Sequence, residues 1–309
     1  MQTAEQRLSE SLDAAGLAFD GVSVSTAAIA SPLRLATEWA GFTLIHDGRA
    51  CHAKVLFDDM RPLIDPARSA EASFNAARAG AAPQLLHADA ERGVLLFEAL
   101  PAPDWKWARV DQLSAPDRLE RLLGLKRQVH QGPRTGFARS PGEDLARLRQ
   151  LCHEHGVLLP DDAPWIDQCV DMAVRAIAAA GWDSRSLHGD GVASNVLLDA
   201  EGQMRLVDFD YGGAFDPWFD VATTLNELYP FEDQWRQGLE IWAGVCREAD
   251  YARCRLHALI DDWHWTLWGL WAGTRSARNV EFSKVGQWTL LRTREALRDH
   301  RFENWLRQV

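Results

Sequence analysis

Short apolar runs alternate with polar residues through the first hundred positions of the chain. A polar, amphipathic stretch over residues 4–17 predicts a helix, and apolar or small residues at helical spacing after Pro66 predict a second helix ending near Gly80. Short, partly alternating runs separated by glycine or Asp-Gly indicate antiparallel strands. The expected strands cover residues 33–39, 42–46, 50–57, 84–89 and 94–100. Pro101 and Pro103 then break the pattern, which predicts a lobe boundary.

Beyond residue 104 the apolar positions recur mainly at helical spacing. The expected helices cover residues 114–130, 141–154, 164–180, 217–228, 231–248, 251–274 and 283–299. Residues 186–213 interrupt them with two short apolar strands around an acidic glycine turn. A polar hairpin inside a helical region is a place where chemistry is often found. The pattern predicts an α+β chain, with a sheet-containing lobe of residues 1–100 and a helical lobe of residues 101–309.

Composition excludes several classes of protein. Hydrophobic residues make up 47% and charged residues 25%, which excludes a disordered, collagen-like or coiled-coil chain. The net charge of −11 argues against a nucleic-acid partner, which needs a basic surface. Five cysteines without C-x-x-C spacing indicate free thiols in a reducing compartment. No long apolar run and no secretion signal is evident, so we expect a cytoplasmic protein that does not bind membranes.

The segment between residues 188 and 210 carries the groups that phosphoryl transfer requires. His188-Gly-Asp190 is followed by Asn195, and Asp208-Phe-Asp210 begins thirteen residues after Asn195. A carboxylate can accept the proton of a hydroxyl, while an amide oxygen and a second carboxylate can bind Mg²⁺ that bridges phosphates. A single aspartate in a loop is more often a helix cap or a turn residue. The spacing of the whole set therefore carries this interpretation.

This H-G-D-x-x-x-x-N…D-F-D pattern resembles the signature of the aminoglycoside phosphotransferase and choline kinase superfamily, whose members share the bilobal protein-kinase-like fold. The resemblance implies a kinase that uses ATP and Mg²⁺, with GTP not excluded by the sequence. It implies that Asp190 is the catalytic base and that Asn195 and Asp208 bind the metal. His188 belongs to the same catalytic motif and would brace its loop by hydrogen bonding.

The first lobe supplies candidates for nucleotide binding. Lys54 is the only lysine before residue 100 and lies in an apolar, strand-like run. The resemblance implies that Lys54 holds the phosphates, that Glu71 on the following helix orients it, and that Glu98 and Leu100 form the hinge beside the adenine. A lysine that guards an edge strand is the alternative for Lys54. No G-x-G-x-x-G precedes Lys54, which favours a small-molecule kinase over a protein kinase.

The motif continues in ways that bear on the phosphate acceptor. Tyr211 follows the D-F-D directly. A D-P-x-x-D-V-A motif comes shortly after it, and the second aspartate of this motif is Asp220. This order, with Asn226-Glu227 after it, leans towards bacterial choline and ethanolamine kinases, although those enzymes more often carry Glu at the position of Asp210. We expect Asp210 and Tyr211 to lie near the acceptor and Asp220 to cap or brace the catalytic loop.

The chain has 14 tryptophans against 3 tyrosines, and Trp265 and Trp268 fall on one face of a predicted helix. Asp261 and His264 lie nearby. Choline kinases have a similar W-x-x-W-G, whose aromatic rings hold a quaternary ammonium, and such a cation without N–H groups is bound well by aromatic faces. The alternative is a helix packed into the core through its tryptophans.

We therefore expect a small-molecule alcohol as acceptor, a cation such as choline or ethanolamine. An aminoglycoside, a sugar or homoserine is the alternative for the same chemistry. A nucleotide-binding pseudokinase is disfavoured because none of the four groups with catalytic, metal or phosphate roles is missing. The sequence leaves a homodimer open.

Overall fold

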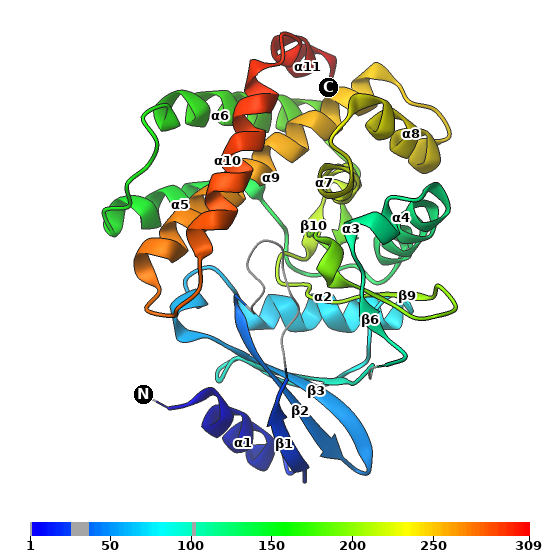
Figure 1. Cartoon of the computed structure of the whole chain (residues 1–309), viewed down its shortest axis with the longest axis vertical. Helices are drawn as coiled ribbons and strands as arrows, with labels where there is room; N and C mark the ends of the chain where they lie inside the picture. The colour runs from blue at the N-terminus through cyan, green and yellow to red at the C-terminus, as the bar shows by residue number, and fades with distance from the viewer. Residues whose placement is uncertain (1, 26–36, 101–102) are drawn as a thin grey trace.

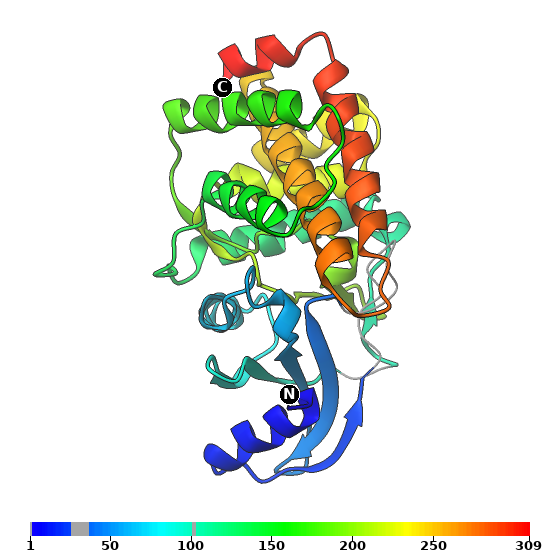
Figure 2. The same ribbon diagram turned by 90° about the vertical axis from the view of Figure 1, so that its left-hand side faces the viewer.

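The computed structural model describes residues 2–25, 37–100 and 103–309. An antiparallel sheet with two helices occupies one end of the molecule, and a larger helical part occupies the other (Figure 1). The amino terminus lies beside the sheet and the carboxyl terminus lies among the helices at the opposite end (Figures 1 and 2). This arrangement confirms the α+β class predicted from the sequence.

The first part of the chain forms a five-stranded antiparallel sheet in the order β1-β2-β3-β5-β4. Its elements are α1 (Ala4–Ala14), β1 (Asp20–Val24), β2 (Trp39–His46), β3 (Arg49–Leu56), the 3-10 turn η1 (Asp58–Met60), α2 (Pro66–Arg78), β4 (Leu85–Asp89) and β5 (Val94–Glu98). Most follow the predicted boundaries closely. The strand expected over residues 33–39 lies mostly outside the described residues, and β1 was not expected.

Alternate residues of β3 face opposite sides of the sheet, as the pleat of a strand requires. One side packs against α1 in a core made of Leu8, Leu12, Phe42, Leu44, Cys51, Ala53, Val55, Val94 and Leu96. His52 and Lys54 point to the other side, which faces the helical part of the molecule. Lys54 pairs across the strands with Gly41 and Leu95. The alternation thus places Lys54 on a central strand, away from the core under α1.

The helical part contains two small sheets, ordered β10-β7 and β6-β8-β9. Its elements are β6 (Lys106–Trp107), α3 (Val110–Leu113), α4 (Pro116–Gln131), α5 (Pro141–Glu154), α6 (Ala163–Ala180), β7 (Arg185–Leu187), η2 (Ala193–Asn195), β8 (Val196–Leu198), β9 (Met204–Leu206), β10 (Gly213–Phe215), α7 (Pro217–Leu228), α8 (Glu232–Ala243), α9 (Glu248–Arg275), α10 (Phe282–Arg298) and α11 (Phe302–Gln308). Helices α3 and α11 were not expected. Helix α8 ends earlier than predicted, because Gly244 adopts a left-handed conformation that terminates it.

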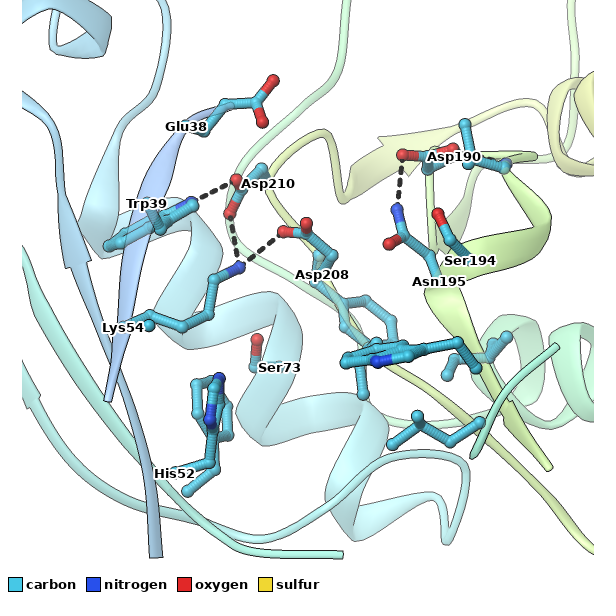
Figure 3. A pocket seen from close by; sticks show the side chains of 18 of the residues that line it. Glu38, Trp39, His52, Lys54, Ser73, Asp190, Ser194, Asn195, Asp208 and Asp210 are labelled. Atoms are coloured by element: carbon cyan, nitrogen blue, oxygen red, sulfur yellow. Dashed lines mark hydrogen bonds and ion pairs between the residues drawn. The ribbon is translucent and has the colours of Figure 1, made fainter. Parts of the chain in front are cut away.

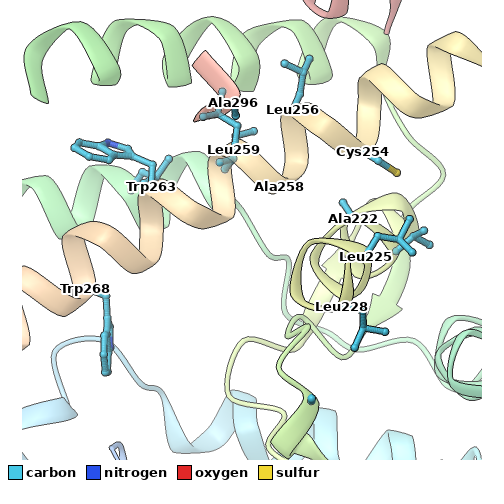
Figure 4. Close-up of a cluster of buried hydrophobic side chains, with 14 of the residues drawn as sticks. Ala222, Leu225, Leu228, Cys254, Leu256, Ala258, Leu259, Trp263, Trp268 and Ala296 are labelled. Atoms are coloured by element: carbon cyan, nitrogen blue, oxygen red, sulfur yellow. The ribbon is translucent and has the colours of Figure 1, made fainter. Parts of the chain in front are cut away.

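Helix α9 is the centre of the helical part and is packed by α5, α6, α7, α10 and α11. Trp263 is fully buried and donates to Asp167, while the equally buried Trp271 donates to His155. Figure 4 shows Trp263 and Trp268 pointing to different sides of this helix. Part of the tryptophan excess is therefore core packing around one long helix. Within the described residues no helix combines the length and apolarity that a membrane crossing needs.

Replacing Gly269 by alanine should destabilise the protein by about 1–3 kcal/mol through overpacking. Helices α9 and α10 approach so closely here that a Cβ on Gly269 would lie 2.4 Å from the backbone nitrogen of Gly286. Gly124 on α4 is a matched control, because a Cβ there meets nothing within 4 Å. Gly124→Ala should stabilise the helix by about 0.5–1 kcal/mol. Urea unfolding measures both variants, and equal effects would contradict the close approach.

Candidate active site

A cavity of about 620 Å³ lies between the sheet and the helical part and is lined from both (Figure 3). The predicted site residues that line it are Lys54, Glu98, Leu100, Asp190, Asn195, Asp208, Asp210, Tyr211, Trp265 and Trp268. Glu71 and His188 were also predicted as site residues, and neither lines the cavity. Residues far apart in the sequence thus meet in one space.

Asp190 and Asn195 are held together in the loop that leads into η2. The side-chain amide of Asn195 donates to Asp190 Oδ2 over 2.9 Å, and the Val192 N–H donates to Asp190 Oδ1 over 2.7 Å. Because the nitrogen of the Asn195 amide faces Asp190, its oxygen is left for another partner. Asp190 is 9% exposed and reaches the cavity, where its remaining lone pairs can accept a proton.

His188 lies behind the catalytic loop and holds its shape. Burial, followed by the charge of Lys126, lowers the pKa of His188, so the imidazole is neutral. A neutral imidazole has one N–H, and both ring nitrogens lie beside backbone carbonyls: Nε2 is 2.8 Å from the Val207 oxygen and Nδ1 is 3.0 Å from the Asp190 oxygen. Lys126 also donates to the Asp190 carbonyl over 2.6 Å. His188 thus contacts the loops around Asp190 and Val207 and does not itself line the cavity.

Asp220 supports the same loop through hydrogen bonds to its backbone. Its carboxylate accepts from the backbone N–H groups of His188 (3.0 Å) and Gly189 (2.8 Å) and from His130 Nε2 (2.8 Å). Burial alone would raise the pKa of Asp220, but Lys126 and His130 outweigh it and hold that pKa far below its usual range. These contacts confirm that Asp220 braces the catalytic loop.

Steric crowding explains why the middle residue of the H-G-D motif is glycine. Gly189 adopts a φ of 81°, and a Cβ there would lie 2.0 Å from the Tyr211 carbonyl oxygen. Arg139 donates to the carbonyls of Gly189 (2.6 Å) and Tyr211 (2.8 Å) at this crossing. Arg139 thus joins the Asp190 loop to the Asp208 loop. The sequence analysis did not identify it, because an isolated arginine before a helix carries no motif.

Lys54 of β3 contacts the carboxylates of the D-F-D motif within the cavity (Figure 3). Its Nζ lies 2.6 Å from Asp208 Oδ1 and 4.0 Å from Asp210 Oδ1. Burial lowers the pKa of Lys54, but the two carboxylates outweigh burial and the net pKa is raised. Asp208 adopts a φ of 68°, which is uncommon for a residue other than glycine and typical of functional sites. The lysine and the predicted metal ligand therefore share one charged cluster.

One prediction about this cluster is wrong. Glu71 does not orient Lys54; its carboxylate accepts from Thr135 and Gly136 instead. Helix α2 turns Ser73 to the cavity, and Glu71, two positions earlier, lies roughly 200° around the helix. Asp210 lies in the same charged cluster, near Lys54, and accepts from Trp39 Nε1. Its predicted place beside the acceptor stays a prediction.

Trp39 and Glu38 are functional candidates that the sequence analysis missed. The Trp39 ring lies under Lys54 Nζ, 4.8 Å from its centroid. Burial, followed by the charge of Asp208, raises the pKa of Glu38 to about 8. Both residues lie at the start of β2 and reach the cluster only because the sheet folds over the helical part. No local pattern in the sequence indicates this.

Strand β5 ends at the edge of the cavity, where the hinge is expected. The backbone N–H groups of Glu98 and Ala99 donate to the carbonyls of Gln84 (3.0 Å) and Ala50 (3.1 Å). Among the described residues, none accepts from the N–H of Leu100. The Glu98 carboxylate accepts from the Gln84 N–H over 2.9 Å, so it braces the neighbouring strand.

The far end of the cavity combines aromatic rings with carboxylates. Trp265 contacts Tyr211 and Trp268 edge-to-face, with ring centroids 5.2 Å apart in each pair. Asp261 lies on the same stripe of α9, four residues before Trp265. Glu227 of α7 also lines this end. The sequence signal for Asp261 was its helical spacing from Trp265, and Glu227 lies in the Asn-Glu pair to which no role was assigned.

Asp261 should make the protein less stable as the pH rises. Burial, with repulsion from Asp262 and Asp190 opposed by Arg139 and Arg292, raises the pKa of Asp261 to about 8. An unfolded aspartate has a pKa near 3.9. Between these values the native state binds more protons than the unfolded state, so stability falls as the pH rises from about 4 to about 8.

Asp261→Asn removes this penalty and should therefore stabilise the protein by about 1–3 kcal/mol at pH 8.5, with no gain near pH 4. Urea unfolding at both pH values measures the effect. Asp233→Asn, which removes an exposed carboxylate on α8, is the matched control. Loss of stability in the Asp261 variant at pH 8.5 would show that this carboxylate has a partner in the native protein.

Comparison with known proteins agrees with this geometry. A choline/ethanolamine kinase family protein from Mesorhizobium loti has a TM-score of 0.73 at 20% identity over 91% of this chain and 92% of its own. Choline kinase LicA from Streptococcus pneumoniae has a TM-score of 0.74 at 14% identity over 94% and 97%. An aminoglycoside 2'-phosphotransferase-IIIa solved with GDP has a TM-score of 0.61 at 13% identity over 95% and 99%.

These likenesses establish the kinase-like fold. By sequence alone, no curated protein matches the chain. The model of the phosphotransferase enzyme family, however, matches residues 28–257, which include Lys54 and the whole of the Asp190 and Asp208 loops. The chain therefore belongs to the phosphotransferase enzyme family and is a phosphotransferase that acts on a hydroxyl acceptor.

Proposed function

We propose that this protein transfers the γ-phosphate of ATP to the hydroxyl of a small cationic amino alcohol such as ethanolamine or choline. The observation that carries the proposal is one cavity that joins Lys54 and Asp208 to Asp190 and then to an end lined by aromatic rings and carboxylates. A polyphosphate suits the end with a lysine, and a small cation suits the acidic, aromatic end. Asp190 lines the same cavity and would accept the hydroxyl proton.

The residues at the centre of the cavity fit a magnesium ion. Asn195 leaves its amide oxygen free, and although burial opposes it, Lys54 lowers the pKa of Asp208, which keeps that carboxylate ionised. Hard oxygen ligands of this kind suit Mg²⁺, with phosphate and water completing the shell. The metal would neutralise charge on the phosphates when bound. Lys54 would exchange its contact with Asp208 for the phosphates, and Arg139 would keep the two loops in register.

The nucleotide base would lie at the hinge. Because the N–H groups of Glu98 and Ala99 are already engaged, we assign the backbone contact with the base to Leu100. The side chains at the hinge carry little information about the base, so ATP is the proposed donor and GTP an alternative. We place the lobe boundary at residues 100–101 and the protein in the reducing cytoplasm, since all five cysteines are free.

A substrate panel tests the proposal. ADP release with Mg²⁺ and ATP would be measured with ethanolamine, choline, homoserine, an aminoglycoside and several sugars. We expect turnover with an amino alcohol that exceeds the ATPase background and disappears in Asp190→Asn. Turnover of sugars or aminoglycosides alone would contradict the proposed acceptor, while leaving the phosphotransferase family unaffected.

A further inference from the structure

Asp261 is a buried carboxylate without a partner. It is 9% exposed and lines the acceptor end of the cavity, and among the described residues no hydrogen bond or ion pair reaches it. Its neighbour Asp262 is buried as well, but it accepts from Asn226 (3.0 Å) and pairs with Arg292. The chain thus supplies partners for one of two adjacent buried carboxylates and leaves the other facing the cavity.

A second carboxylate at this end is only partly satisfied. Glu227 accepts from the backbone N–H of Ala193 over 3.3 Å, and no other described residue donates to it. Burial raises the pKa of both Glu227 and Asp261, and the negative charge of Asp190 contributes to both shifts. Glu227 is bonded to Ala193 of the Asp190 loop, and Asp190 and Asp261 line the same cavity. A cation held by Glu227 and Asp261 would lie a short spacer away from the hydroxyl that Asp190 deprotonates.

The aromatic side of the pocket is arranged as a wall. Trp268 is 1% exposed and packs against Phe282, with ring centroids 5.5 Å apart. Trp265 is in edge-to-face contact with Tyr211, His264 and Trp268. These rings therefore pack against one another and present an apolar surface to the ligand on one side of the pocket. Asp261 lies one helical turn away on the same face of α9.

A buried carboxyl group that has no donor is costly to ionise, and a cationic ligand with N–H groups removes that cost by donating to the carboxylate. A quaternary ammonium has no N–H, and its methyl groups hold the positive nitrogen away from the carboxylate oxygens. A site built to bond an N–H discriminates strongly against an analogue that lacks it. Because Asp261 has no donor among the described residues, the site should favour a ligand that supplies an N–H group.

Resting on the proposed function, we infer that the acceptor is a short amino alcohol whose ammonium carries N–H groups, and that Asp261 selects it over a quaternary ammonium. Asp261 and Glu227 accept the N–H groups, the Trp265 wall contacts the carbon chain, and the hydroxyl reaches Asp190. Asp261 is the specificity-determining residue of this site.

The methylation series ethanolamine, N-methylethanolamine, N,N-dimethylethanolamine and choline tests this inference. For the wild-type protein, kcat/KM should fall along the series, with ethanolamine at least roughly tenfold above choline. Asp261→Asn should lower kcat/KM for ethanolamine by at least roughly tenfold, mainly through KM, and change the value for choline less than about threefold. Asp233→Asn should leave the whole series unchanged.

Three outcomes would overturn the inference. Choline equal to or better than ethanolamine in the wild-type protein would do so, as would an equal loss for all four amines in Asp261→Asn. Both results would leave the proposed function standing. No turnover of any of the four amines, with turnover of a sugar or an aminoglycoside, would instead overturn the proposed function and the inference with it. Thermal unfolding of the variant confirms that it is folded.

Discussion

Asp190→Asn is expected to lower kcat by roughly 10²–10⁴-fold, the range that a positioned general base contributes. Asparagine keeps the size of the side chain and can still accept from the Val192 N–H, although its amide nitrogen replaces the oxygen that accepts from Asn195. Affinity for the Mg²⁺-bound, non-hydrolysable nucleotide should change less than about tenfold, because Lys54 and Asp208 are untouched.

Steady-state kinetics and nucleotide titration separate these two effects. Asp233→Asn again controls for the loss of one negative charge far from the cavity. Retention of full activity by Asp190→Asn would remove Asp190 as the base. A parallel loss of nucleotide binding would assign it a role in the phosphate site instead.

Asp220→Asn should destabilise the protein by about 3–5 kcal/mol, because it leaves a buried cation without its counterion. The side chains of Lys126 and Asp220 are 2% and 0% exposed, and their charged atoms lie 3.8 Å apart. His130 and two backbone N–H groups also depend on this carboxylate.

The loss should depend on pH in a defined direction. The pKa of Asp220 is depressed in the native state, so its contribution to stability is present above the pKa of an unfolded aspartate, near 3.9, and is lost as the pH falls below it. Urea unfolding at pH 7 and at pH 3 measures the difference between wild type and variant. A difference below about 1 kcal/mol at pH 7 would mean that the network supports the loop without stabilising the fold.

Local patterns were sufficient for most elements. Pro66 and Gly80 bounded α2, and the apolar, strand-like run placed Lys54 on a strand, now β3. The H-G-D-x-x-x-x-N spacing was sufficient for Asp190 and Asn195, because both belong to one continuous loop whose geometry is set by local hydrogen bonds.

Contacts between distant segments could not be predicted in the same way. Glu71 was assigned from its position on a helix, but which face of α2 meets the cavity depends on how the helix packs, and the small side chain of Ser73 faces it instead. Trp39 meets Asp210 across 171 positions of sequence. Such pairs follow from the way the sheet folds over the helical part, which no local pattern encodes.

The tryptophan excess divides between structure and site. Trp263 and Trp271 are bonded within the core around α9, while Trp265 and Trp268 belong to the same helix but face the cavity. Trp288 of α10 lines the cavity as well and is 56% exposed. Spacing along one helix distinguishes its faces, but only the packing of α9 shows which face is buried against helices and which meets the cavity.

Phosphorus NMR of the wild-type protein with ATP, Mg²⁺ and ethanolamine tests the central claim most directly, because it locates the transferred phosphate. We predict that the γ-phosphate signal is replaced by that of a phosphate monoester of the alcohol, together with ADP, and that Asp190→Asn forms the monoester at least roughly 100-fold more slowly. Release of ADP with inorganic phosphate alone, or no reaction with any amino alcohol, would contradict the account.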